Sequence, residues 1–308
     1  MLVIPITSTI PPAFLHIPCH PQCRTGKDSI PPTTTMLQRD EYIEQAYFFQ
    51  ILGERLLQDI PIQDILEQVR DETLATTKLP IALDYMLAEL CSTGVVSPAM
   101  EQLAHYFTPF QTHLIREAER DDGKFDLRAA VTILQSEAEY RADEPSRAGL
   151  FLYQLESICH NNLPYDSGLF AMSEDAFYDE HWQQWILVVR RQIGIIEIAD
   201  LIFSRSGHYI NLRNRHQTQS ASPEQTVLFG EKEGRIALAN SGKDPLFLFA
   251  SLQRHLGYPQ VPRPKPIDET KNVIAVLQQK LDQLSIRTKF LEDESRGGID
   301  LTQYYKKP

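Results

Sequence analysis

Cysteine is scarce in this sequence, and its scarcity excludes the disulfide-stapled domains typical of small secreted proteins. The 308 residues contain only four cysteines: Cys19, Cys23, Cys91 and Cys159. Thiols at such scattered positions do not form a disulfide framework, which requires several closely spaced pairs. We therefore expect reduced thiols and a cytoplasmic protein, with Cys91 and Cys159 as small residues of a core.

Long uncharged apolar runs are lacking too. The best candidate for a membrane span, Trp185–Phe203, contains four charged residues: Arg190, Arg191, Glu197 and Asp200. Each such charge at the centre of a bilayer costs about 2.5–3.5 kcal/mol, so the stretch is a poor span. The apolar N-terminus has no basic segment and is interrupted by proline, which argues against a signal peptide. We expect no membrane partner.

The motifs of several common active sites are missing as well. The chain has no GxGxxG, GxxxxGKS/T, HExxH or GxSxG, so nothing indicates a dinucleotide site, a P-loop or the usual hydrolase sites. None of the nine histidines follows a glutamate by three residues, the spacing that a di-iron helical bundle requires. Zinc-type ligands cluster at His16, Cys19, His20 and Cys23, but their spacing and proline-rich surroundings favour chance. We expect no catalytic residue, metal or cofactor.

Positive charge is in short supply, except in one region. The net charge of −11 and the pI near 5.3 argue against a general binder of nucleic acid or anionic membrane. Residues 186–254 nevertheless hold nine basic and six acidic residues. Arg205, Arg213 and Arg215 form the densest part and are possible anion-binding residues, for phosphate, RNA or DNA. We favour contact between this patch and the acidic helices of the same protein, which leaves nucleic acid as a less favoured partner.

The sequence predicts a mainly α protein whose first segment, residues 1–36, is a disordered leader rich in proline and threonine. Proline ends helices and strands and prevents this segment from forming one apolar face, so we expect it to pack against nothing. Residues 37–205 show apolar residues at helical spacing and predict an irregular helical bundle. Ser97-Pro98 and Thr108-Pro109 each place a capping hydroxyl before proline, as at the start of a helix.

One helix of this bundle is expected to be long, from about Ala176 to Phe203. Its apolar stripe, which we place at the centre of the core, includes Trp182, Trp185, Ile186 and Val189. Polar residues elsewhere in the bundle are expected to face solvent or cap helices. They include His105, His113, Glu117, Glu119, Glu137 and Glu139, which more often form a solvated face than a catalytic pair.

Residues 206–260 differ from the bundle in composition and apolar pattern. They predict a loop, a small β-hairpin and a short helix packed on the bundle. The hairpin pairs Thr226–Phe229 with Arg235–Ala239 around Glu-Lys-Glu-Gly, and the basic 205–216 stretch is expected to be largely loop. The short helix begins after Asp244-Pro245 and ends at Gly257. Residues 261–266, VPRPKP, then form a stiff extended spacer.

Residues 267–296 predict a coiled-coil-like amphipathic helix, followed by a flexible tail at 297–308. The apolar seam of this helix contains the partner-binding candidates Ile274, Leu277, Leu281, Leu284 and Leu291. An isolated helix of this length is only marginally stable in water, so the apolar seam has to pack against another surface. Three covers are possible: a second copy in a homodimer, the chain's own body, or a helix of another protein. The spacer favours the homodimer because it holds the helix away from the body.

Three functions are compatible with these features. The leading one is a non-enzymatic scaffold or adaptor that self-associates, or binds a protein partner, through the C-terminal helix. The second is a nucleic-acid-associated regulator that uses the basic 205–216 stretch with the hairpin as a wing. The third is an enzyme whose site is assembled from residues scattered along the chain.

Overall fold

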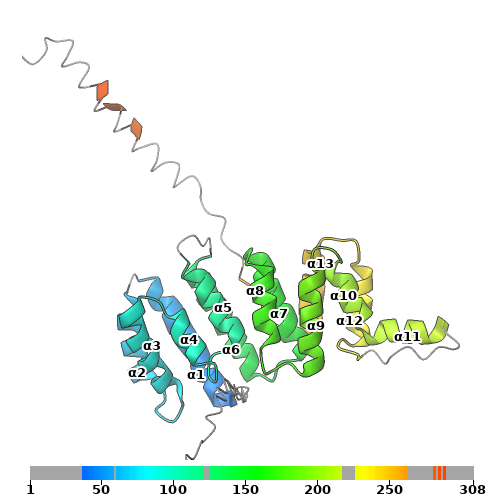
Figure 1. The fold of residues 1–308 in the computed structure, drawn as a ribbon, viewed down its shortest axis with the longest axis horizontal. Coiled ribbons are helices and arrows are strands. Elements are labelled where there is room, and N and C mark those ends of the chain that lie inside the picture. Colours follow the sequence, from blue (N-terminus) through cyan, green and yellow to red (C-terminus); the bar gives the residue numbers. More distant parts are fainter. Residues whose placement is uncertain are drawn as a thin grey trace, which may run out of the picture. The chain divides into compact units, whose positions relative to one another are not determined.

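The computed structural model describes residues 37–58, 60–120, 125–216 and 226–262, and in the C-terminal segment residues 280–281, 284–285 and 287–288. These residues form thirteen named helices and no strand, so the mainly α prediction is confirmed (Figure 1). The helices are α1 (Arg39–Leu56), α2 (Ile62–Glu72), α3 (Leu79–Thr93), α4 (Ser97–Gln102), α5 (Pro109–Ala118), α6 (Leu127–Ala142), α7 (Arg147–His160), α8 (Tyr165–Ser173), α9 (Glu180–Gln192), α10 (Ile198–Ser204), α11 (Gly207–His216), α12 (Glu231–Ala239) and α13 (Pro245–Leu256). Within this part of the chain, every helix is too short or too polar to cross a membrane. The predicted leader lies outside the described residues.

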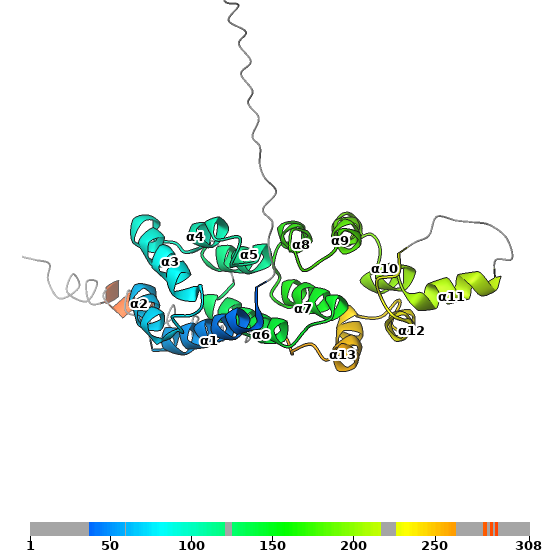
Figure 2. The ribbon, with the colours of Figure 1, turned by 90° about the horizontal axis from the view of Figure 1, so that it is seen from below.

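The helices between residues 37 and 262 pack in two layers. Figure 2 shows α3, α4, α5, α8 and α9 in one layer and α1, α6, α7 and α13 in the other. The most extensive contact joins α1 to α6, which are distant in sequence, and α13 packs against α7. Their shared apolar side chains form one continuous core. The predicted helical bundle is therefore a layered packing of short helices.

The predicted tryptophan centre of the core is confirmed. Trp182 and Trp185 on α9 are 4 % and 3 % exposed. The Trp185 ring lies 4.8 Å from Phe151 of α7 and 5.1 Å from Phe229, measured between ring centroids. The Asp179 side chain accepts a hydrogen bond from the Trp182 backbone N–H at 3.0 Å and so fixes the start of α9.

The predicted long helix is wrong in one respect, because it is two helices. α9 ends at Gln192, and α10 begins at Ile198. Between them Gly194 has a φ of +87°, a left-handed conformation that glycine adopts without strain, and Ile193 bridges to Ile196. The apolar residues keep their helical spacing across this turn, which is why the sequence pattern reads as continuous.

The predicted β-hairpin is also wrong, since its second half is helix α12. Gly230 precedes this helix, and Glu231 and Glu233 in the first turn favour a helix start because carboxylates complement the helix dipole. Gly234 is not a turn residue: a Cβ there would lie 2.2 Å from the Ser206 side chain, so the glycine permits a close helix contact. Phe229 makes only an isolated bridge, to Ser206. The expected basic loop is likewise helix α11.

The local capping predictions have a mixed outcome. Thr108 and Gln111 form a full capping box at α5, and α13 begins at an Asp244 cap and ends at left-handed Gly257, as predicted. The Ser97 side chain does not cap α4. Instead, the Glu119 carboxylate accepts hydrogen bonds from the Val96 and Ser97 backbone N–H groups at 2.6 and 3.0 Å. A tertiary neighbour therefore supplies the cap that we expected from the local sequence.

Candidate functional site

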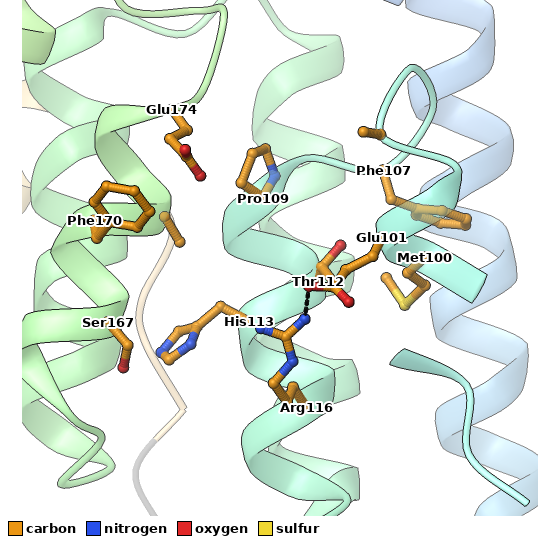
Figure 3. A pocket seen from close by; sticks show the side chains of 12 residues that line it. Met100, Glu101, Phe107, Pro109, Thr112, His113, Arg116, Ser167, Phe170 and Glu174 are labelled. Atoms are coloured by element: carbon orange, nitrogen blue, oxygen red, sulfur yellow. Dashed lines mark ion pairs between the residues drawn. The ribbon is translucent and has the colours of Figure 1, made fainter. Parts of the chain in front are cut away.

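A groove opens between α4, α5 and α8 (Figure 3). Its volume is about 310 Å³, within the range of small-ligand and side-chain pockets. α5 forms the centre, with α4 on one side and α8 facing it on the other. The lining residues are Met100, Glu101, Ala104, Phe107, Pro109, Thr112, His113, Arg116, Ser167, Phe170, Ala171 and Glu174.

The capping box at Thr108 sets the orientation of α5 in this groove. The Thr108 side chain accepts a hydrogen bond from the Gln111 N–H at 3.3 Å, and the Gln111 side chain accepts one from the Thr108 N–H at 3.1 Å. The helix that starts there presents residues three and four apart on one face. His113 and Arg116 consequently reach the groove together.

His113 is buried, whereas the sequence analysis expected it at the surface. It is 4 % exposed, and its Nε2 has no hydrogen-bond partner among the described residues. Burial lowers the pKa of the His113 imidazole, Arg116 lowers it slightly further, and Glu117 opposes both effects. The imidazole is therefore neutral near pH 7. A neutral ring suits a largely apolar wall, because no buried charge has to be compensated.

Gly168 on α8 permits the close approach of this wall. A Cβ at this position would lie 2.7 Å from Ile158 Cδ1 and 3.3 Å from His113 Nε2. We expect Gly168→Ala to lower the free energy of unfolding by about 1–3 kcal/mol, because the methyl overpacks a buried contact. Urea denaturation followed by circular dichroism measures the change.

Gly53, in the last turn of α1, provides the control for this substitution. A Cβ there would meet Val131 at 3.5 Å, an ordinary contact. Gly53→Ala should therefore raise stability by about 0.4–1 kcal/mol, since alanine restricts the unfolded chain. If Gly168→Ala also stabilised the protein, the close approach of α8 to His113 and Ile158 would be contradicted.

Some of the charges on the rim of the groove are already partnered. The Arg116 guanidinium pairs with the Glu101 carboxylate across the α5–α4 side, as the dashed line in Figure 3 shows. On α8, the Phe170 ring is 44 % exposed, and the Arg190 guanidinium lies 5.1 Å from its centroid. The largely apolar walls suit the binding of an apolar segment, and the Glu174 carboxylate adds a negative charge to the rim. The sequence did not predict this groove, because its three helices meet only in the fold.

A buried ionic cluster lies on α6 close to the core. The Arg141 guanidinium donates to Glu137 Oε1 at 2.8 and 3.1 Å and also pairs with Asp175. The Gln154 amide donates to the same Glu137 oxygen at 2.7 Å. Glu137 is fully buried, so the expected solvated face is wrong here, whereas Glu139 is exposed. Burial raises the pKa of Glu137 despite the opposing effect of Arg141.

A second groove, of about 240 Å³, lies beside the Gly194 turn and is almost entirely apolar. Its lining residues are Leu155, Cys159, Tyr165, Ile193, Gly194, Ile195, Ile196, Glu197, Ile198, Pro245 and Phe249. Ile195 is 84 % exposed, although isoleucine is usually buried. We call this surface the Ile195 groove.

The cysteines depart in part from the core positions expected of them. Cys159 is half-buried in the Ile195 groove, and burial raises the pKa of its thiol to about 11. The Cys159 thiol is therefore a weak nucleophile at neutral pH. Cys91 is exposed on α3, which corrects its predicted place in the core.

The predicted anion-binding arginines lie at α10 and α11. Arg205 ends α10, and its carbonyl accepts hydrogen bonds from the Leu228 and Phe229 N–H groups. Arg213 and Arg215 lie on α11, which packs against α12. Glu231 and Glu233 lie on α12, so acidic residues of the same body occupy the neighbouring helix. The bound partner of these arginines remains a prediction.

Two of the five predicted seam residues can be located. Leu281 and Leu284 are helical and are 64 % and 58 % exposed. Ile274, Leu277 and Leu291 lie outside the described residues. Two leucines three residues apart on a helix share one face, so Leu281 and Leu284 form an exposed apolar pair.

Comparison with known proteins supplies no relative from which a role for these surfaces could be transferred. No protein-family model, no curated protein and no solved structure matches the chain.

Proposed function

We propose that this protein is a non-enzymatic scaffold that self-associates through its C-terminal amphipathic helix. The observation that carries the proposal is the exposure of Leu281 and Leu284, more than half of each side chain, on described helical residues. Both positions belong to a heptad seam that runs through residues 267–296. An exposed leucine pair in such a seam indicates a surface that is covered in an assembly.

The amphipathic helix predicted for residues 267–296 depends on packing for its stability. Isolated helices are marginal in water, and most of their stability comes from packing an apolar face. The described body has a continuous core between residues 37 and 262, and we propose that it folds without the seam. The sequence places three prolines in residues 261–266, between the two parts, and such a segment favours a stiff extended spacer. A second copy supplies an identical apolar face, and homodimers are the commonest soluble oligomers.

The nucleic-acid alternative gains no comparable support. Its wing-like element was the hairpin at Thr226–Ala239, and α12 stands in the second half of that segment. The arginines at α10 and α11 have acidic residues on the adjacent helix. We therefore propose the scaffold alone.

Leu281→Asp tests the proposal. The parent protein should be a dimer at tens of micromolar in light scattering, and Leu281→Asp should be a monomer. A carboxylate buried without a partner costs several kcal/mol. This cost is large enough to dissociate a short helix pair. The melting of the body should be unchanged, because Leu281 is 64 % exposed.

The control is Gln279→Asp, which adds the same charge at the heptad position opposite the seam. It should leave the dimer intact. A parent protein that is monomeric at tens of micromolar would contradict self-association, as would a Leu281→Asp protein that dimerises as tightly as the parent.

A further inference from the structure

We infer that the C-terminal helix of one copy docks into the Ile195 groove of a second copy, so that two copies exchange helices in a closed dimer. The inference rests on the proposed self-association and names the surface that the seam covers. It joins two features of the chain: an apolar groove on the body and an apolar seam on the helix.

The groove selects apolar side chains. Its walls come from α7, α8, α13 and the turn between α9 and α10, and Glu197 is the one charged residue that lines it within the described chain. The Glu197 carboxylate already accepts a hydrogen bond from the Gly242 N–H at 2.7 Å. No lining charge therefore calls for a charged ligand, and an aliphatic ridge is the matching partner.

The Gly194 turn creates this surface. Gly194, in a left-handed conformation, lies in the turn that joins α9 to α10, and Ile195 in the same turn is exposed to solvent. Tyr165, also part of the groove, is 41 % exposed, and Ile196 is 38 % exposed. Adjacent exposed aliphatic and aromatic side chains around a concavity are typical of a protein-interaction site.

The helix has the complementary surface. A helix with apolar residues at a and d positions presents a row of aliphatic side chains, and recognition of such a row by an apolar groove is a recurrent mode of binding. The row here runs from Ile274 to Leu284 in the sequence. The row spans about three helical turns, or ~16 Å.

The chain leaves the described body close to the groove. The Tyr258 hydroxyl, a single donor, lies 2.8 Å from a Glu156 carboxylate oxygen on α7 and 3.1 Å from the Phe249 carbonyl oxygen on α13, and these two helices also line the groove. Val261 is buried, and Pro262 is the last described residue of the body. The remaining spacer residues reach about 15–20 Å when extended, enough to cross to a facing copy.

The groove belongs to the second copy and not to the same chain, because Leu281 and Leu284 are exposed in the single chain. Two copies related by a two-fold axis make the helix–groove contact twice. This doubling adds to the buried area, so the closed dimer is more stable than a pair of copies held by a single helix–groove contact.

Ile195→Asp in the full-length protein tests the inference. Ile195 is largely exposed, so the substitution should leave the fold of the body intact. Circular dichroism checks this expectation. Light scattering over a dilution series should show a dimer dissociation constant at least about tenfold higher than that of the parent. Ile81→Asp is the matched control: Ile81 on α3 is 74 % exposed and lies outside the groove, so this variant should dimerise like the parent.

Mixing two variants separates exchange from helix pairing. Leu281→Asp retains a groove but has a damaged seam, and Ile195→Asp has the opposite defect. If helices exchange, the mixture recovers dimers through one intact helix–groove contact, whereas each variant alone stays monomeric. If the helices instead pair with each other, every mixed pair contains one Leu281→Asp helix with a buried carboxylate. The mixture then forms no dimers between the two variants.

The outcomes distinguish this inference from the proposed function. A dimeric Ile195→Asp protein with the parent's dissociation constant, beside a monomeric Leu281→Asp protein, overturns the exchange but leaves self-association through the seam standing. A monomeric parent overturns both. Loss of the dimer in both variants but not in Ile81→Asp, with recovery on mixing, supports helix exchange.

Discussion

Trp185→Ala should lower the free energy of unfolding by about 3–5 kcal/mol, because it leaves a cavity at the aromatic centre of the core. The Trp185 ring lies within 4.8–5.5 Å of Phe151, Phe229 and Trp182, measured between centroids. A single domain is typically stable by only about 5–15 kcal/mol, so this one truncation removes a large fraction. Urea denaturation should be followed by far-ultraviolet circular dichroism, since the substitution itself changes the fluorescence.

Phe247→Ala is the control for this truncation. Phe247 is 62 % exposed on α13, so its loss should change stability by less than about 0.5 kcal/mol. A Trp185→Ala protein that unfolds at the parent's urea midpoint would show that the cluster around α9 is not the centre of the core.

Arg141→Met should have a comparable effect through electrostatics. Methionine fills much of the space of the arginine stem but leaves Glu137 and Asp175 buried without their shared cation. Breaking a buried ion pair on one side costs about 3–5 kcal/mol. Loss of the guanidinium also raises the pKa of Glu137 beyond its already raised value. The carboxyl then protonates as the pH falls, so the destabilisation should be smaller at about pH 5 than at about pH 7.5.

The pair of Arg120 with Glu117, whose side chains are 50 % and 12 % exposed, provides the reference for this experiment. The two side chains lie 3.3 Å apart. Arg120→Met should cost at most about 1 kcal/mol, as is usual for surface ion pairs. Equal effects of Arg141→Met and Arg120→Met, or an Arg141→Met effect that grows on acidification, would contradict the role of the buried cluster.

Features with a local cause could be predicted from the sequence. The apolar stripe containing Trp182 and Trp185 has helical spacing, and the capping residues Thr108 and Asp244 act on their own helices. Such signals depend on neighbours three or four positions away, which a sequence displays directly. The general architecture and the tryptophan core followed from them.

Features with a tertiary cause could not be predicted. Gly234 resembles a turn residue until Ser206 is seen against it, and Gly194 interrupts an apolar pattern that continues on both sides. His113 and Glu137 are buried by neighbouring helices that the local sequence does not reveal. Beside Glu137, Arg141 meets Asp175, which lies 34 positions further along the chain. Both grooves combine residues from three or more segments, so no spacing rule could have assembled them.

The pairing of α1 with α6 has a consequence for synthesis of the chain. The apolar face of α1 is complete once Leu56 has been added, but its main cover begins only at Leu127. At ~5–20 residues per second, ribosomes take on the order of several seconds to make the segment between them. Throughout that interval Phe48 and Phe49, both buried in the finished protein, have no α6 to pack against. A nascent chain paused before Leu127 should therefore be a preferred target of chaperones that recognise exposed apolar helices, and one paused after α6 should escape them.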